Sequence, residues 1–516
     1  MRNSLFHSFV LIVYFEDSHS FIRVRIFFEI FFRNLRSSSI GSFCYEKISF
    51  VFLFCVQLFF SQVNIGVKND VFIYTNALVS NPSAFLQNSN PWEVNLVSAD
   101  AYLHNNYGFI SKQSLLGLSG ADNLTINNTA NQSDLPKNTI GFGDYRRFDG
   151  HFQGDILGPA VALKFKIKDH EFAAGFYTRL RTFGNSFGLD NQYKHDNFVN
   201  QISYNRFFQP FSASVATLQE NNFFVSKSFF QTKSSEFNFG ITLKQSKVWD
   251  AAFVREKDVF TIDYDKTTNS LRFSNYNAEA LFATSYNFDN NKYEPKNNGS
   301  SIGGDVGFTY IDYGNYDKEN GEYFQKIAFS VTDIGFIKVK GEKHLFQGSS
   351  FLVNQNTDFQ NVNSISDFLK ELSTHVYGNP NVSLQTTDFK VALPTALHLS
   401  YSGNLLKNRY LTFGITQRLP LSENAFKSPN LLYVNFAKTN RLLTYAAQFS
   451  MFEYKKLQFG GYLRFGPIFI GSDNVLPVFF KQKELNSFDI YLGLKIYPFW
   501  DNALTRRARQ KCNCNK

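Results

Sequence analysis

Runs of alternating apolar and polar side chains recur along this chain from about residue 158 to residue 497. In the run Glu171–Arg181, Phe172 and Phe176 fall on one face, whereas Tyr177 and Arg179 fall on the other. A period of two residues separates the two faces of a β-strand. The runs are about 9 to 11 residues long, which is the length of a tilted membrane-spanning strand and exceeds that of most strands in soluble sandwiches. We therefore predict an all-β chain whose strands cross a membrane.

The abundance of aromatic residues supports this prediction. The chain has 61 Phe and 26 Tyr, although its mean hydropathy is only −0.24. The body of the chain also lacks apolar runs of about 18 residues, which a membrane helix requires. Strands that face lipid on one side alone combine these properties, and their backbone groups are satisfied in a membrane when the sheet closes. We expect a transmembrane antiparallel β-barrel of about 14 strands over residues 158–497, in a bacterial outer membrane.

The expected partners follow from this location. Outer-membrane lipid is the first, and lipopolysaccharide or other envelope proteins are further candidates. The net charge of +9 and the pI near 9.0 raise the question of nucleic acid. The basic residues are dispersed among the strands instead of forming one stripe, so we expect no nucleic-acid partner. No cofactor is expected.

The first 61 residues read as a leader. Residues 47–61 have the layout of a signal peptide, with Lys47 before an apolar core and the small Ser61 at the end. A secretory n-region is normally only a few residues long, so residues 1–46 do not fit in front of it. We expect translation to begin near Glu46, with residues 1–46 an upstream extension.

Three further segments depart from the alternation. Residues 62–157 are irregular, and we expect an N-terminal section with a plug-like or first-strand role, which contributes one or two strands or enters the lumen. Ser364–Leu372 is the best helix, because Ser364 has the character of an N-cap and Asp367 follows three residues later. Residues 498–516 form a basic tail, which we expect in the periplasm.

The four cysteines, whose spacing predicts neither a disulfide framework nor a metal knuckle, are Cys44, Cys55, Cys512 and Cys514.

Basic side chains on the inward faces are the candidate site residues. They suggest a basic lumen that favours anionic solutes through its summed field. Inward Glu171, Glu236 and Asp489 offer the alternative that bases and acids pair in a structural network, which we favour. The lumen-lining candidates are Lys164, Lys166, Arg179, Arg181, Lys244, Arg464 and Lys495.

Catalytic and metal sites are not predicted, and we expect that the protein is not an enzyme. His398 and Ser400 lie two residues apart and share a strand face, as in an H-x-S pair, but their surroundings lack the spacing of a phospholipase. The oxygen-rich tract Asp122–Asp134 lacks the closing Glu of an EF-hand. Gly141-Phe142-Gly143 lacks the third Gly and the helix of a phosphate-binding loop.

Several short motifs resemble an uncharacterised family of outer-membrane β-barrel proteins from Bacteroidota, known only as a domain of unknown function. The resemblance covers almost all of residues 63–497, and it implies a barrel without established catalytic residues. Some family members look similar to transporters of hydrophobic substrates, and others carry a periplasmic peptidoglycan-binding domain. This chain departs from the latter by ending in a short basic tail. The motifs are Asn81–Phe85, Trp92–Ala99, Asn105–Tyr107, Gln153–Pro159, Val331–Gly335, Leu393–Thr395 and Leu463–Asn474.

Two functions remain open at this point. The first is a pore or transporter that passes small or amphipathic solutes through the lumen. The alternative is a structural barrel or assembly platform that binds surface or secretion partners.

Overall fold

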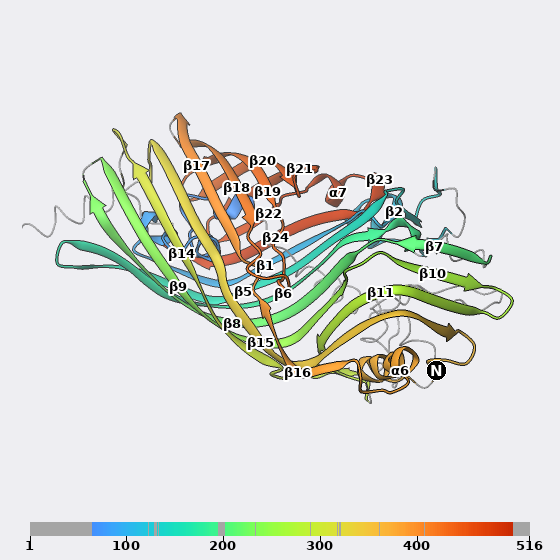
Figure 1. Ribbon diagram of the computed structural model, residues 1–516. Helices are drawn as coiled ribbons and strands as arrows, with labels where there is room; N and C mark the ends of the chain where they lie inside the picture. The colour runs from blue at the N-terminus through green and yellow to red at the C-terminus, as the bar shows by residue number, and fades with distance from the viewer. Residues whose placement is uncertain are drawn as a thin grey trace, which may run out of the picture.

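The computed structural model describes residues 64–498, except 122, 128–131, 133, 194–201, 233, 289, 317, 319–320, 361 and 407 (Figure 1). The expected leader, the upstream extension and nearly all of the basic tail, with the four cysteines, lie outside the described residues. No helix in the described part of the chain is long and apolar enough to span a membrane.

Fourteen strands of the described residues close into one antiparallel ring, as predicted. The ring closes at β1, which pairs on both sides: Ala101 lies opposite Ile490 of β24 and opposite Gly154 of β5. The strands are β1 (Trp92–Asn105), β5 (Arg147–Ile167), β6 (His170–Asp190), β8 (Phe211–Gln231), β9 (Ser235–Glu256), β14 (Gly299–Asp312), β15 (Gln325–Asn354), β17 (Ala396–Leu406), β18 (Arg409–Arg418), β19 (Leu431–Thr439), β20 (Leu443–Phe452), β21 (Lys456–Phe465), β22 (Ile468–Ser472) and β24 (Ser487–Ile496).

The barrel begins earlier in the chain than the alternation indicated. β1 and the first part of β5 belong to the ring, so the expected boundary between residues 157 and 158 divides a strand. The alternation is interrupted there because the register of β5 against β6 shifts between Leu157 and Ala160, around Pro159. A proline donates no backbone hydrogen bond and is accommodated at such a bulge.

Several strands are also much longer than the expected runs. β9 has 22 residues and β15 has 30. Along β9 the apolar side chains change faces: Ile241 and Leu243 point outward and are exposed, whereas Val248 and Phe253 are buried in the interior. The ring therefore has a zone with an apolar outside and a zone with an apolar inside.

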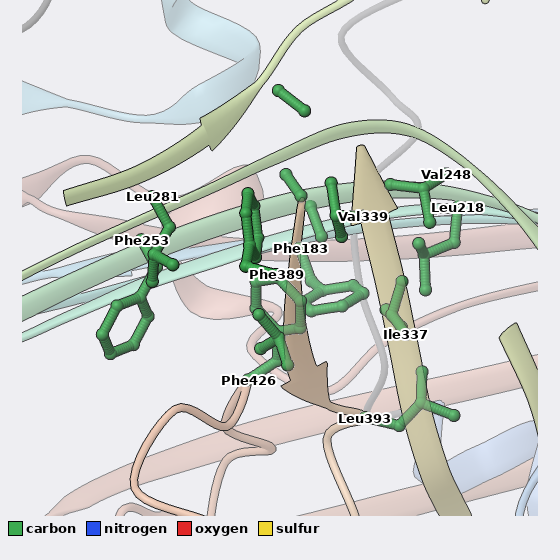
Figure 2. Close-up of a cluster of buried hydrophobic side chains, with 14 residues drawn as sticks. Phe183, Leu218, Val248, Phe253, Leu281, Ile337, Val339, Phe389, Leu393 and Phe426 are labelled. Atoms are coloured by element: carbon green, nitrogen blue, oxygen red, sulfur yellow. The ribbon is translucent and has the colours of Figure 1, made fainter. Parts of the chain in front are cut away.

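The second zone contains a buried apolar cluster that fills one end of the ring. Figure 2 shows Phe183, Leu218, Val248 and Phe389 meeting there, and Phe426 joins them from the segment between β18 and β19. Phe183 and Phe426 meet edge to face, with ring centroids 5.2 Å apart.

Additional elements gather at this end, on the right of Figure 1. The predicted helix is α6 (Ile365–Tyr377), which begins after Ser364; the Ser364 hydroxyl accepts from the Asp367 N–H at 3.1 Å. The sheet is extended by β7 (Tyr204–Phe208), β10 (Phe260–Asp265), β11 (Ser270–Ala283) and β16 (Leu384–Ala392). The smaller elements are β2 (Gly108–Gln113), α4 (Leu115–Leu118), β3 (Thr125–Ile126), β4 (Thr139–Phe142), η4 (Asn191–Tyr193), β12 (Tyr286–Asn287), β13 (Lys292–Tyr293), α7 (Leu476–Phe479) and β23 (Gln482–Leu485).

Candidate functional site: a plugged lumen

Residues 64–91 lie inside the ring and fill much of it; we call this segment the plug. It contains the short helices α3 (Ile65–Lys68), η2 (Ala77–Val79) and η3 (Ala84–Gln87). At one wall the Ile65 N–H donates to the Asp473 carboxylate at 2.9 Å. At the opposite wall the Ser226 hydroxyl donates to the Pro82 carbonyl at 2.6 Å. The plug therefore reaches across the lumen.

Two wall glycines let the plug approach closely. A Cβ on Gly240 would lie 2.5 Å from the Pro82 carbonyl carbon, and one on Gly307 would lie 2.1 Å from the Asn81 side-chain oxygen. The Ser83 hydroxyl is 2.6 Å from the Thr309 hydroxyl. The motif at Asn81–Phe85 thus docks the plug on β9 and β14.

Ion pairs hold the beginning and the end of the plug. Arg464 donates to Asp70 at 2.7 Å, and Lys495 donates to Glu93 at 2.8 Å. Glu93 also accepts from the backbone N–H of Thr75 at 3.0 Å. Two of the candidate lumen residues therefore serve to anchor the plug.

A buried ionic cluster lines the wall between β5 and β15. Arg181 lies 2.7 Å from both Glu220 and Asp333, and Lys244 lies 2.8 Å from Asp333. Two more carboxylates complete the cluster: Asp155 is 2.8 Å from the Nε of Arg179, and Asp305 is 2.8 Å from Lys244. Three cations and four carboxylates give a formal charge of −1. These three bases form a compensated network and add no free positive field to the lumen.

The remaining candidates lie near the turn between β5 and β6. Lys164 donates to the Asn88 carbonyl of the plug and lies 3.7 Å from Glu171. Lys166 is exposed. Lys318, which sequence reasoning missed, bonds to Glu171 at 2.8 Å and also pairs with the fully buried Glu236. Asp489, the third inward acid, accepts from the backbone N–H of Asp473.

A cavity of about 110 Å³ lies between the plug and part of the wall formed by β15, β17 and β18. His398 and Ser400 line it. The ring nitrogens of His398 lie 3.0 Å from the hydroxyls of Thr332 and Thr416, so both nitrogens are engaged by threonines. This arrangement supplies no base for Ser400. Among the described residues, no group of three or more His, Cys, Asp or Glu is placed to hold a metal ion.

Two sequence motifs meet at a strained point in the cavity wall. Asp333 has a φ of 57° and Gly335 a φ of 152°, and the register of β14 against β15 shifts beside them. The Thr395 hydroxyl donates to the Asp333 carbonyl at 2.7 Å, and the Leu393 N–H donates to the Gly335 carbonyl at 3.0 Å. The bulge turns the Asp333 carboxylate toward Arg181 and Lys244.

A closed antiparallel ring with an N-terminal segment in its lumen defines a plugged β-barrel. The chain belongs to DUF5723, a family of unknown function, whose model matches residues 82–473. No curated protein matches the chain.

The chain has weak similarity to several solved bacterial proteins. The toluene transporter TodX of P. putida is 11% identical, with a TM-score of 0.36, over 82% of this chain and 93% of that one. A TodX deltaS2S3 mutant, titled a monoaromatic hydrocarbon channel, is 10% identical, with a TM-score of 0.34, over 82% and 94%. A FadL homologue of Pseudomonas aeruginosa is 9% identical, with a TM-score of 0.23, over 84% and 96%. All three TM-scores lie below 0.5, so no function is carried over from these proteins.

Proposed function

We propose that the protein is an outer-membrane channel for small or amphipathic solutes, closed by the plug. The outward apolar side chains support the membrane location, because a large exposed apolar surface on a closed barrel matches a lipid-facing band. Ile241, Leu243 and Phe223 are 45%, 58% and 54% exposed and lie on neighbouring strands.

The asymmetric seating of the plug carries the transport proposal. On one side Phe85 and Leu86 pack in a buried apolar cluster with Tyr177 and Phe224 of β6 and β8. On the other side a cavity of about 110 Å³ lies between the plug and part of β15, β17 and β18, where the Ser330 hydroxyl still donates to the Ser80 carbonyl. A segment that served only to fill the barrel would be expected to pack to native density on both sides. Solutes would therefore pass along the β15 side when the plug shifts.

A disulfide between plug and wall tests this proposal. In a Cys512→Ser, Cys514→Ser background, Ser83→Cys with Thr309→Cys should form a bond, because the hydroxyls they replace lie 2.6 Å apart. Oxidation should reduce solute entry in liposome-swelling assays to the level of empty liposomes, and reduction should restore it.

The matched control joins two wall strands and leaves the plug free. Thr439 and Thr444, of β19 and β20, also have hydroxyls 2.6 Å apart. Oxidised Thr439→Cys with Thr444→Cys should transport like the reduced form. Equal transport by the oxidised and reduced plug–wall variant would contradict the proposal, and no solute entry under either condition would favour the structural barrel.

Displacing the plug should have the opposite effect. A valine at Gly240 would occupy the space of the Pro82 backbone, so Gly240→Val should raise the resting conductance of single barrels in planar bilayers. Gly461→Val is the control, because a Cβ at Gly461 meets nothing within 4 Å. An unchanged conductance in Gly240→Val with a folded barrel would show that the plug does not close the lumen.

A further inference from the structure

Lys326 differs from the other buried bases of the barrel. Its side chain is inward on β15, 9% exposed, and lines the cavity beside the plug. Within the described part of the chain, Lys326 forms no hydrogen bond or ion pair; its ammonium lies 5.2 Å from the centre of the Tyr323 ring. By contrast, Arg181, Lys244 and Lys495 each have a carboxylate within 2.8 Å. The Lys326 ammonium thus faces the cavity without an acidic partner among the residues that the structure describes.

Leaving a buried charge without a partner is costly, so buried charges in proteins are normally paired or hydrogen-bonded. We propose that the partner of Lys326 is the solute itself, and that the cavity binds small organic monocarboxylates with the carboxylate against the Lys326 ammonium. This inference rests on the proposed channel function and names its substrate class.

The apolar part of the cavity lining fits the apolar part of such a solute, while Lys68, Arg179 and Asp333 belong to its polar part. Ala77 and Val79 of the plug line it together with Ala328 and Leu431 of the wall. A cavity of about 150 Å³ holds a benzene molecule. The cavity of about 110 Å³ therefore suits a shorter apolar body, such as the chain of butyrate.

The cavity also follows β15 lengthwise. Lys326, Ala328, Ser330 and Thr332 all line it from the inward face of one strand. At about 3.3 Å per residue, these positions span about 20 Å along the strand. Lys326 lies near the start of β15, so the carboxylate site is at the end of this track that lies away from the apolar cluster of Figure 2.

Calorimetric titration of the detergent-solubilised full-length protein with butyrate tests the inference. Lys326→Met should weaken butyrate binding by about tenfold or more, because a charge-assisted hydrogen bond is lost. Lys326→Arg should retain most of it. Butyramide, which has the same shape without the charge, should bind the wild type as weakly as butyrate binds Lys326→Met. Lys438→Met is the matched control, since Lys438 also lies over a tyrosine ring but on the outward face of β19.

The outcomes separate the inference from the channel function. Equal butyrate affinity in the wild type and in Lys326→Met, or equal affinity for butyrate and butyramide, would overturn the carboxylate site even if the disulfide switch controls solute entry. Lys326-dependent binding without solute entry in liposomes would support the site and contradict the channel.

Discussion

Replacing Arg181 by methionine is expected to destabilise the barrel by about 3–5 kcal/mol, the usual cost of breaking a buried ion pair from one side. Arg181 is fully buried and lies within 2.7 Å of both Glu220 and Asp333. Its removal would leave the cluster with two cations for four carboxylates in a region of low dielectric. Methionine preserves much of the side-chain volume, so the lost charge would dominate the effect.

Urea unfolding in detergent micelles, followed by tryptophan fluorescence, would measure this loss. Lys338→Met provides the control: Lys338 and Asp388 form a pair at 3.3 Å, but their side chains are 73% and 52% exposed. Such exposed pairs contribute about 0–1 kcal/mol. If both variants unfolded at the same urea concentration, the ionic cluster would not stabilise the folded barrel. The double variant with Glu220→Gln should lose less than the sum of the two single losses, because the two residues interact directly.

The barrel and its inward faces could be predicted from the sequence because a strand places alternate side chains on opposite faces. Phe172 and Arg179, for example, fall on the faces assigned to them by parity alone. The preference for a paired network over a basic lumen also matches the contacts of Arg179, Arg181 and Lys244. The helix at α6 was predictable because its N-cap is a local signal.

The carboxylate partners of the basic residues were harder to predict. Wherever a bulge adds one residue to a strand, odd and even positions exchange faces, so alternation no longer tells which side chains point inward. Asp155 and Ala162 both point inward although their numbers differ in parity, since the shift around Pro159 lies between them. Asp333 is turned into the interior by another bulge. Asp70 and Glu93 lie in or beside the plug, where no periodic pattern exists. Their contacts depend on tertiary docking over hundreds of residues, as between Asp70 and Arg464.

Under the proposed membrane location, the change of apolar face along β9 marks where the strands would leave the lipid. Outward Ile241 lies between Val225 and Val306 on the neighbouring strands, whereas outward Gln245 and Lys247 are exposed and polar. Beyond them the apolar side chains turn inward and pack against one another, as expected for a sheet surrounded by water. The first part of β9 is therefore suited to contact lipid on its outer face, and the later part is suited to contact water.

Ile241→Arg is therefore expected to destabilise the barrel in lipid vesicles by about 2–4 kcal/mol, the cost of a basic side chain near the middle of the bilayer on the lipid face. Gln245→Arg points to the same side of β9, but at the polar edge of the apolar band, where the cost falls to about 0–1 kcal/mol. Reversible folding into phosphatidylcholine vesicles would measure both. If the two arginines cost the same, the outward band does not contact hydrocarbon. A large difference between them would instead locate the edge of the membrane between residues 241 and 245. Both positions point outward and are four residues apart on β9, so they would differ mainly in their depth in the bilayer.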